Sequence, residues 1–114
     1  MSFNEATKLY RDVYKRFEKI EKRPWGVEGA VMELTHQVGT LALNVMKQEK
    51  YYFYSTTGDD YTEQIADEIA DVFGQIIRIA DYYQINLLEA HIKERNKEVR
   101  CLEENKAGGQ VLCF

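Results

Sequence analysis

The sequence predicts an all-α protein of four helices, and three observations support this fold class. Its 114 residues include one proline and seven glycines, so long segments contain neither of the residues that most often interrupt a helix. Apolar side chains recur at steps of three and four residues in four separate segments, which is the period of an amphipathic helix. Hydrophobic residues make up 45% and charged residues 30% of the chain, which suits a packed domain rather than a disordered segment.

The first two predicted helices lie on either side of Pro24. Ser2 starts the first helix and forms a capping box with Glu5. Pro24 ends it, because the residue before a proline avoids helical backbone angles. The apolar face of the first helix comprises Ala6, Leu9, Val13, Phe17 and Ile20. The second helix runs to about Glu49, and its apolar stripe comprises Val27, Val31, Leu34, Val38, Leu41 and Val45.

A polar segment, residues 55–60, separates the second helix from the third and predicts a hairpin loop. Asp60 or Thr62 caps the third helix, and the fourth begins near Asn86, where Glu89 completes another capping box. The apolar stripe of the third helix comprises Ile65, Ile69, Val72, Ile76, Ile79 and Tyr83. The buried side of the fourth comprises Leu88, Ile92, Val99 and Leu102. We therefore predict one domain over residues 1–107 and a short tail at 108–114.

Each amphipathic stripe needs an apolar partner, and packing of helix on helix is the simplest way to supply one. Four helices of this length form a small core, so we expect a four-helix bundle completed by oligomerisation, as a homodimer or a homotetramer. The aromatic tract at residues 51–54 either belongs to that contact or closes the end of the bundle.

Charge and hydropathy exclude several classes of function. The net charge of −4 argues against general binding of a nucleic-acid backbone. No segment is apolar enough to span a membrane, and the N-terminus lacks the apolar centre of a signal peptide. Cys101 and Cys113 lack metal-ligand spacing, so we expect a cytoplasmic protein with reduced thiols, a disulfide between them being the less favoured alternative.

Polar side chains border the apolar stripes of the second and third helices. Glu68 and Asp71 are three residues apart, so their carboxylates lie on one helical face, and Gln75 and Arg78 continue this line. A similar line on the second helix comprises Glu33, Gln37, Thr40 and Asn44. In an antiparallel hairpin the two lines would face each other, and Mg²⁺ would relieve the repulsion between their carboxylates. A solvated acidic face is the simpler interpretation of the Glu68–Asp71 pair alone.

Two stretches of these helices resemble the motifs of the MazG-like nucleotide pyrophosphohydrolases. Residues 33–42, Glu-Leu-Thr-His-Gln-Val-Gly-Thr-Leu-Ala, are similar to the family pattern Glu-Glu-x-Gly-Glu-Leu-Ala. Residues 67–73, Asp-Glu-Ile-Ala-Asp-Val-Phe, are similar to its second motif, Glu-Glu-Leu-x-Asp-Val. The resemblance covers residues 25–100 and implies a MazG-like bundle. It also implies hydrolysis of nucleoside triphosphates to monophosphate and pyrophosphate with Mg²⁺ or Mn²⁺.

The resemblance assigns metal-ligand positions to both motifs. Glu68 and Asp71 retain the carboxylates of the second motif, whereas Gln37 and Thr40 replace those of the first. Two negative charges are therefore missing, which should lower the affinity for Mg²⁺, and Glu33 is a substitute ligand one turn earlier. Gly39 is retained, which predicts close approach of the two helices. The residues expected to contact phosphate or nucleotide are Lys93, Asn96, Arg78 and Trp25.

Two functions therefore stay open. The chain is either a Mg²⁺-dependent nucleoside triphosphate pyrophosphohydrolase or a non-catalytic relative that binds nucleotide or serves as a helical interaction module. A less favoured alternative joins His36 to Glu33, Glu68 and Asp71 as in di-iron helical bundles. The basic residues of the last helix, Lys93 among them, could instead pair with neighbouring glutamates as a solvated face, and Trp25 could be a packing residue.

Overall fold

A computed structural model of the chain describes residues 1–21, 26–51 and 59–106. These ranges contain four helices and no strand, so the predicted all-α class is confirmed. The helices are α1 (Phe3–Ile20), α2 (Val27–Gln48), α3 (Thr62–Tyr82) and α4 (Leu87–Lys106). Pro24, Trp25, most of the aromatic tract and the C-terminal tail lie outside the described residues.

Side chains cap the starts of α1 and α4 as predicted. The Ser2 hydroxyl accepts a hydrogen bond from the Glu5 N–H at 3.1 Å, and the Glu5 carboxylate accepts one from the Ser2 N–H at 3.2 Å. The N-cap residue of α3 is Tyr61, without a side-chain cap, so the prediction of Asp60 or Thr62 is wrong; the Asp60 carboxylate, one residue earlier, accepts the Thr62 N–H at 3.0 Å. The Asn86 side chain accepts the Glu89 N–H at 3.1 Å and so starts α4.

Helices α2 and α3 end in the same backbone motif. Lys50 and Gln84, which follow these helices, have left-handed backbone angles, with φ of 60° and 56°. The hydrogen bonds run from Lys50 N to Lys47 O at 3.2 Å, Tyr51 N to Met46 O at 3.0 Å, Gln84 N to Asp81 O at 3.2 Å and Ile85 N to Ala80 O at 2.8 Å. Both ends are therefore Schellman motifs formed without glycine.

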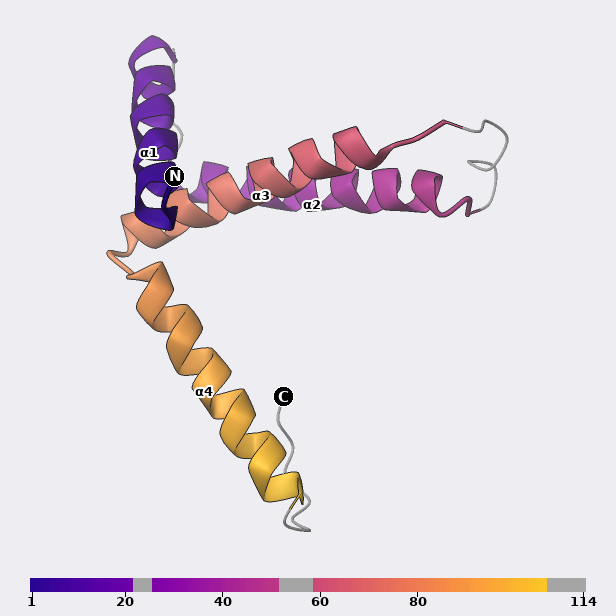
Figure 1. Cartoon of the computed structure of the whole chain (residues 1–114). Coiled ribbons are helices and arrows are strands. Elements are labelled where there is room, and N and C mark those ends of the chain that lie inside the picture. The colour runs from indigo at the N-terminus through magenta and orange to yellow at the C-terminus, as the bar shows by residue number, and fades with distance from the viewer. Residues whose placement is uncertain (22–25, 52–58, 107–114) are drawn as a thin grey trace.

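Helices α2 and α3 lie side by side as an antiparallel hairpin (Figure 1). Near its loop, the Tyr61 N–H donates to the Gln48 side chain at 2.7 Å, which fixes the register of the two helices. Helix α1 crosses the far end of α3, and α4 leaves from that end in a different direction (Figure 1). The fully buried apolar residues near this crossing are Ala30, Ile77 and Ala80.

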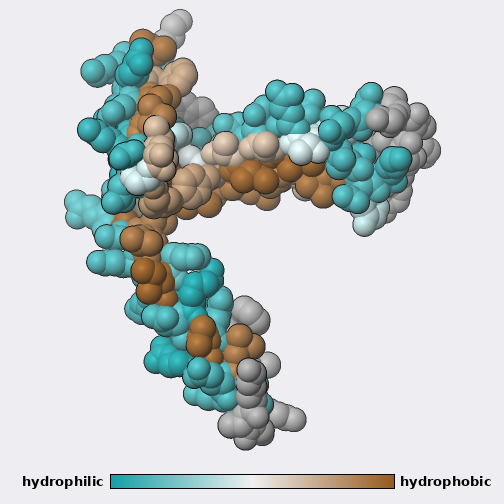
Figure 2. Space-filling view, in the orientation of Figure 1, coloured by the Kyte–Doolittle hydropathy of each residue, from teal (hydrophilic) through white to brown (hydrophobic). Residues whose placement is uncertain are grey.

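The helices of one chain leave most of their apolar faces uncovered. Figure 2 shows hydrophobic residues in a line along α1, along α4 and along one edge of the hairpin. The exposed stripe residues include Leu9, Phe17, Val31, Val38, Ile69, Leu88, Ile92, Val99 and Leu102. The prediction that these stripes are buried is therefore wrong for a single chain, because only α2 and α3 pack along their lengths. The radius of gyration is 18.5 Å, whereas a compact chain of this length has ~13 Å.

Two glycines show where helices approach closely. A Cβ added to Gly74 of α3 would lie 2.6 Å from the Tyr10 ring of α1, so this glycine makes room for the ring. A Cβ added to Gly39 of α2 would meet nothing within 4 Å. Close approach therefore occurs between α1 and α3, and the role predicted for Gly39 in the hairpin is wrong.

Cys101 is buried and disulfide-bonded, so the prediction of a reduced thiol is wrong at this residue. The other cysteine of the chain, Cys113, lies outside the described residues. None of the described helices combines the length and the apolar character that crossing a lipid bilayer requires.

Candidate functional site

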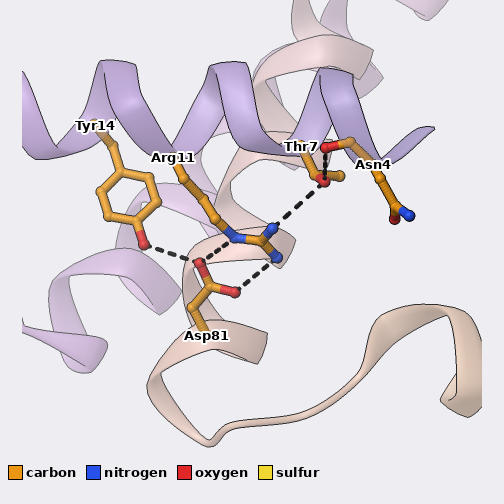
Figure 3. A network of polar contacts seen from close by, with 5 residues as sticks. All are labelled: Asn4, Thr7, Arg11, Tyr14 and Asp81. Carbon is orange, nitrogen blue, oxygen red and sulfur yellow. Dashed lines mark hydrogen bonds and ion pairs between the residues drawn. The ribbon is translucent and has the colours of Figure 1, made fainter. Parts of the chain in front are cut away.

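A network of polar contacts fastens α1 to the end of α3 (Figure 3). Arg11 donates from Nε and Nη2 to the two carboxylate oxygens of Asp81, at 2.8 and 3.0 Å. The Tyr14 hydroxyl donates to the same carboxylate at 2.9 Å. Arg11 also reaches the hydroxyl of buried Thr7 at 3.4 Å. We call Arg11, Tyr14 and Asp81 the α1–α3 clasp.

The clasp shifts the pKa values of its members. Burial alone would raise the pKa of Asp81, but hydrogen bonds from Arg11 and Tyr14, together with the charge of Arg11, hold it below the ordinary value. Burial and the hydrogen bond to Asp81 raise the pKa of Tyr14 to about 12. Asp81 is therefore an ionised acceptor whose charge is already balanced, and Tyr14 stays protonated at neutral pH.

A cavity of about 350 Å³ lies beside the clasp, between α1, the first turn of α2 and the end of α3. Its wall combines cations, phenols and the start of a helix. The residues that matter here are Lys15, Arg78, Tyr14, Tyr82, Gly26 and Glu18. We call this space the junction cavity.

Arg78 is the most enclosed cation of the junction cavity. Its side chain is 15% exposed, and its guanidinium carbon lies 5.3 Å from the centre of the Tyr14 ring. Its ion pair with Glu18, from Nη2, is 3.7 Å long, which exceeds hydrogen-bonding distance. The sequence predicted a ligand contact for Arg78, and the structure places this residue at a cavity; Trp25 lies outside the described residues.

The predicted metal ligands lie on the two helices of the hairpin. Glu33, Gln37 and Thr40 of α2 are half-buried, as is Glu68 of α3, while Asp71 is exposed. The register set by Gln48 and Tyr61 places Gln37 level with the turn of α3 that contains Asp71. The structure thus brings the two predicted polar lines to the same level of the hairpin.

The side-chain oxygens of Thr40 and Gln37, in the first motif, differ in their hydrogen bonds. The Thr40 hydroxyl donates to the His36 carbonyl of its own helix at 3.2 Å. The side-chain carbonyl oxygen of Gln37 is buried and receives no hydrogen bond from the residues that the structure describes, and the same holds for Gln75 of α3. Across the described ranges, no group of three or more histidine, cysteine, aspartate or glutamate residues is arranged to hold a metal ion. The predicted cluster of His36 with the carboxylates is therefore not formed.

The predicted phosphate contacts on α4 lie apart from the hairpin (Figure 1). Lys93 and Asn96 line an open groove along this helix, together with Arg100. Two neighbouring cations pair within the helix, Arg95 with Glu98 at 2.7 Å and Lys97 with Glu94 at 3.7 Å. The alternative that basic residues of this helix pair with neighbouring glutamates is thus observed for Arg95 and Lys97. Within one chain, Lys93 and Asn96 lie on α4 and away from the hairpin.

Sequence reasoning missed the residues that α1 contributes. Tyr10 and Tyr14 are one turn apart, their ring centres lie 5.4 Å from each other, and both face α3. The available signal was a pair of tyrosines bordering an apolar stripe, but it does not reveal the partner. Comparison of the chain with models of protein families, with curated proteins and with solved structures finds no match.

Proposed function

We propose that the α2–α3 hairpin is a nucleotide site of MazG-like type that hydrolyses nucleoside triphosphates to monophosphate and pyrophosphate. The observation that supports this proposal best is the buried carbonyl oxygen of Gln37, which has no donor among the described residues and lies level with Asp71. An unsatisfied buried acceptor is costly, and a cation or its water shell would satisfy it.

The donor set fits a weakly held Mg²⁺ or Mn²⁺. Mg²⁺ is commonly bound through one or two carboxylates, with water and substrate phosphates completing its shell. Glu68 and Asp71 supply the carboxylates, Gln37 and Thr40 offer neutral oxygens, and Glu33 is a further acid on α2. When bound, the ion would neutralise phosphate charge and polarise a water molecule.

Pyrophosphate release by the purified protein tests this activity. The assay covers a panel of ribo- and deoxyribonucleoside triphosphates with Mg²⁺ and with Mn²⁺. We expect metal-dependent release that is lost in Asp71→Asn and kept in Glu63→Gln, which removes an exposed acid from the first turn of α3. Absence of release with every substrate would reject the enzyme and leave a binding protein.

Restoring the missing carboxylates tests the site itself. The double substitution Gln37→Glu and Thr40→Glu should raise the affinity for Mg²⁺ by roughly tenfold or more, because ligand charge sets affinity for hard cations. Isothermal titration with Mg²⁺ measures the change. Unaltered affinity in the double variant would show that these positions do not face a common ion.

A second candidate function, a non-catalytic helical interaction module, is favoured by the exposed apolar faces. The chain exposes 9317 Å², roughly 2,800 Å² more than the ~6,500 Å² expected for a compact monomer of its mass. Burial of such an area in each chain is typical of obligate assemblies. We infer that a second copy of the chain covers these faces, in a homodimer or a homotetramer.

Sedimentation equilibrium tests this assembly. Wild-type protein should sediment as a dimer or tetramer, and Val38→Lys or Ile92→Lys should shift it towards the monomer, because each places a charge on an apolar face. His36→Lys, at an exposed polar position of α2, is the matched control and should leave the mass unchanged. A monomeric wild-type protein would contradict the inference.

A further inference from the structure

We propose that the junction cavity binds the phosphate group of a small ligand of mononucleotide size. The cavity of about 350 Å³ falls within the range of small-molecule sites. It lies at the crossing of α1 with α3, and the proposal requires neither the metal ligands of the hairpin nor hydrolysis.

Two cations of the cavity wall have donors to spare. Arg78 carries five N–H donors, and its ion pair with Glu18 is too long to be a hydrogen bond. Arg11 next to it is different, because Asp81 takes two of its donors at 2.8 and 3.0 Å. Lys15 makes no ion pair with any residue that the structure describes, and it faces the same space. The charge of Lys15 also acts on Asp81, so neither cation is isolated, but a phosphate group would offer both of them the close hydrogen-bond acceptor that Glu18 and Asp81 do not.

The start of α2 adds a third source of positive potential. Gly26 is the N-cap residue and offers no side-chain acceptor, so the first turn has no side-chain cap, although the Glu28 carboxylate lies close to Gly26, with Oε2 3.0 Å from where a Cβ would stand. Gly26 and Val27 both line the cavity, which places the positive end of the helix dipole against it. The cations from α1 and α3 thus converge with a helix N-terminus from a third element.

The two acids of the cavity wall, Asp81 and Glu18, would repel a bound anion to different extents. Asp81 is already neutralised, because Arg11 and Tyr14 donate three hydrogen bonds to its carboxylate. Glu18 is the acid that a phosphate would displace from Arg78. The exposed ring of Tyr82 stands at the wall and gives a planar substituent of the ligand a surface to stack on.

Nuclear magnetic resonance titration of the ¹⁵N-labelled protein tests the proposal. The probes are inorganic phosphate, AMP and adenosine, added at constant ionic strength in the presence of EDTA. Phosphate and AMP should shift the amide signals of Val27, Glu28 and Arg78, and adenosine at the same concentration should not. Because EDTA removes divalent metal, the result is independent of any metal-dependent hydrolysis at the hairpin.

Four substitutions show whether phosphate binds in the junction cavity. Arg78→Gln and Lys15→Gln should each weaken phosphate binding at least fivefold, while Glu18→Gln should tighten it, because it releases Arg78. Arg16→Gln, the neighbouring cation outside this cavity, is the control and should change binding by less than twofold. Lys15→Gln and Glu18→Gln keep the test valid if Arg78→Gln fails to fold.

Three results would overturn the proposal. The first is equal weakening by Arg16→Gln and Lys15→Gln, which would indicate general attraction to a basic face. The second is a shift pattern centred on Lys93 and Arg100 of α4 rather than on the cavity. The third is binding of adenosine as tight as that of AMP, which would show that the phosphate is not the recognised group.

Discussion

Arg11 and Asp81 lie 70 residues apart in the sequence and meet in a two-point hydrogen bond between α1 and the end of α3. Tyr14 donates to the same carboxylate, so two residues of α1 converge on one acid of α3. The clasp acts together with the Tyr10–Gly74 contact and with the edge-to-face contact between the Phe3 and Phe73 rings, and these contacts set where α1 crosses the hairpin.

Arg11→Gln should lower the free energy of unfolding by about 1 kcal/mol, because the pair is hydrogen-bonded but partly open to solvent. Urea denaturation measures the change, and Arg16→Gln is the control. A double-mutant cycle with Asp81→Asn isolates the coupling. Zero coupling energy would mean that the pair does not fasten the helices.

Acid should weaken the fold through Asp81. The pKa of this carboxyl is lower in the folded chain than its ordinary value of about 3.9, so its contribution is fully present above that pH. The contribution disappears as the pH falls through the lower folded-state pKa. Thermal denaturation from pH 6 to pH 2 should therefore show a smaller acid loss in Asp81→Asn than in the wild type. Parallel curves would contradict this assignment.

Alkali should weaken the fold through Tyr14. Its pKa is about 12 in the folded chain, against an ordinary value of about 10. The unfolded chain therefore loses this proton first, and stability falls as the pH rises from the lower value to the higher one. Tyr14→Phe removes this loss, which melting temperatures at pH 9 and pH 11.5 would reveal. An unchanged difference between the two temperatures would show that Tyr14 is not responsible.

The two helical glycines should respond to alanine in opposite directions. Gly74→Ala should destabilise the chain by about 1–3 kcal/mol, because its Cβ would press on the Tyr10 ring. Gly39→Ala should stabilise it by about 0.5–1 kcal/mol, because the position is open and alanine favours a helix. Chemical denaturation of both variants measures the two effects. The same sign for both would contradict the packing described for Gly74.

Gln75→Met should stabilise the protein by about 1 kcal/mol, because it keeps the side-chain shape and removes a buried carbonyl oxygen that has no donor in the described part of the chain. Gln64→Met, at an exposed position of α3, should be close to neutral. Melting temperatures of the two variants measure the difference. A destabilised Gln75→Met would indicate that the amide has a partner in the assembled protein.

The sequence predicts the local part of this fold well, since caps and helical periods depend on neighbouring residues. Ser2 with Glu5 and Asn86 with Glu89 form the predicted caps. The period also identifies an apolar side of each helix, but it does not say what covers that side, and Leu88 of α4 is 53% exposed. Burial of these faces depends on contacts with residues that are far away in the sequence or belong to another chain, and a local sequence pattern does not identify such residues.

The candidate sites divide in the same way. Glu68 and Asp71 share a helical face because three residues separate them, and this follows from the sequence alone. The pairing of Arg11 with Asp81 does not follow from the sequence, because the chain has 15 basic and 19 acidic residues and no local rule selects this pair. Arg11 meets Asp81 because α1 crosses the end of α3, and the same crossing forms the junction cavity.

The short connection after α3 has a mechanical consequence for α4. Gln84 closes the Schellman motif of α3 and Asn86 caps α4, so the backbone between the two helices has little freedom to swivel. A residue inserted between Leu87 and Leu88, inside the first turn of α4, would turn the residues after it by about 100° about the helix axis, since a helix has 3.6 residues per turn. Leu88 and Ile92 would then lie on a different side of α4. The Schellman motif at Gln84 and the cap at Asn86 therefore set both the direction of α4 and the side of the molecule on which its apolar face lies.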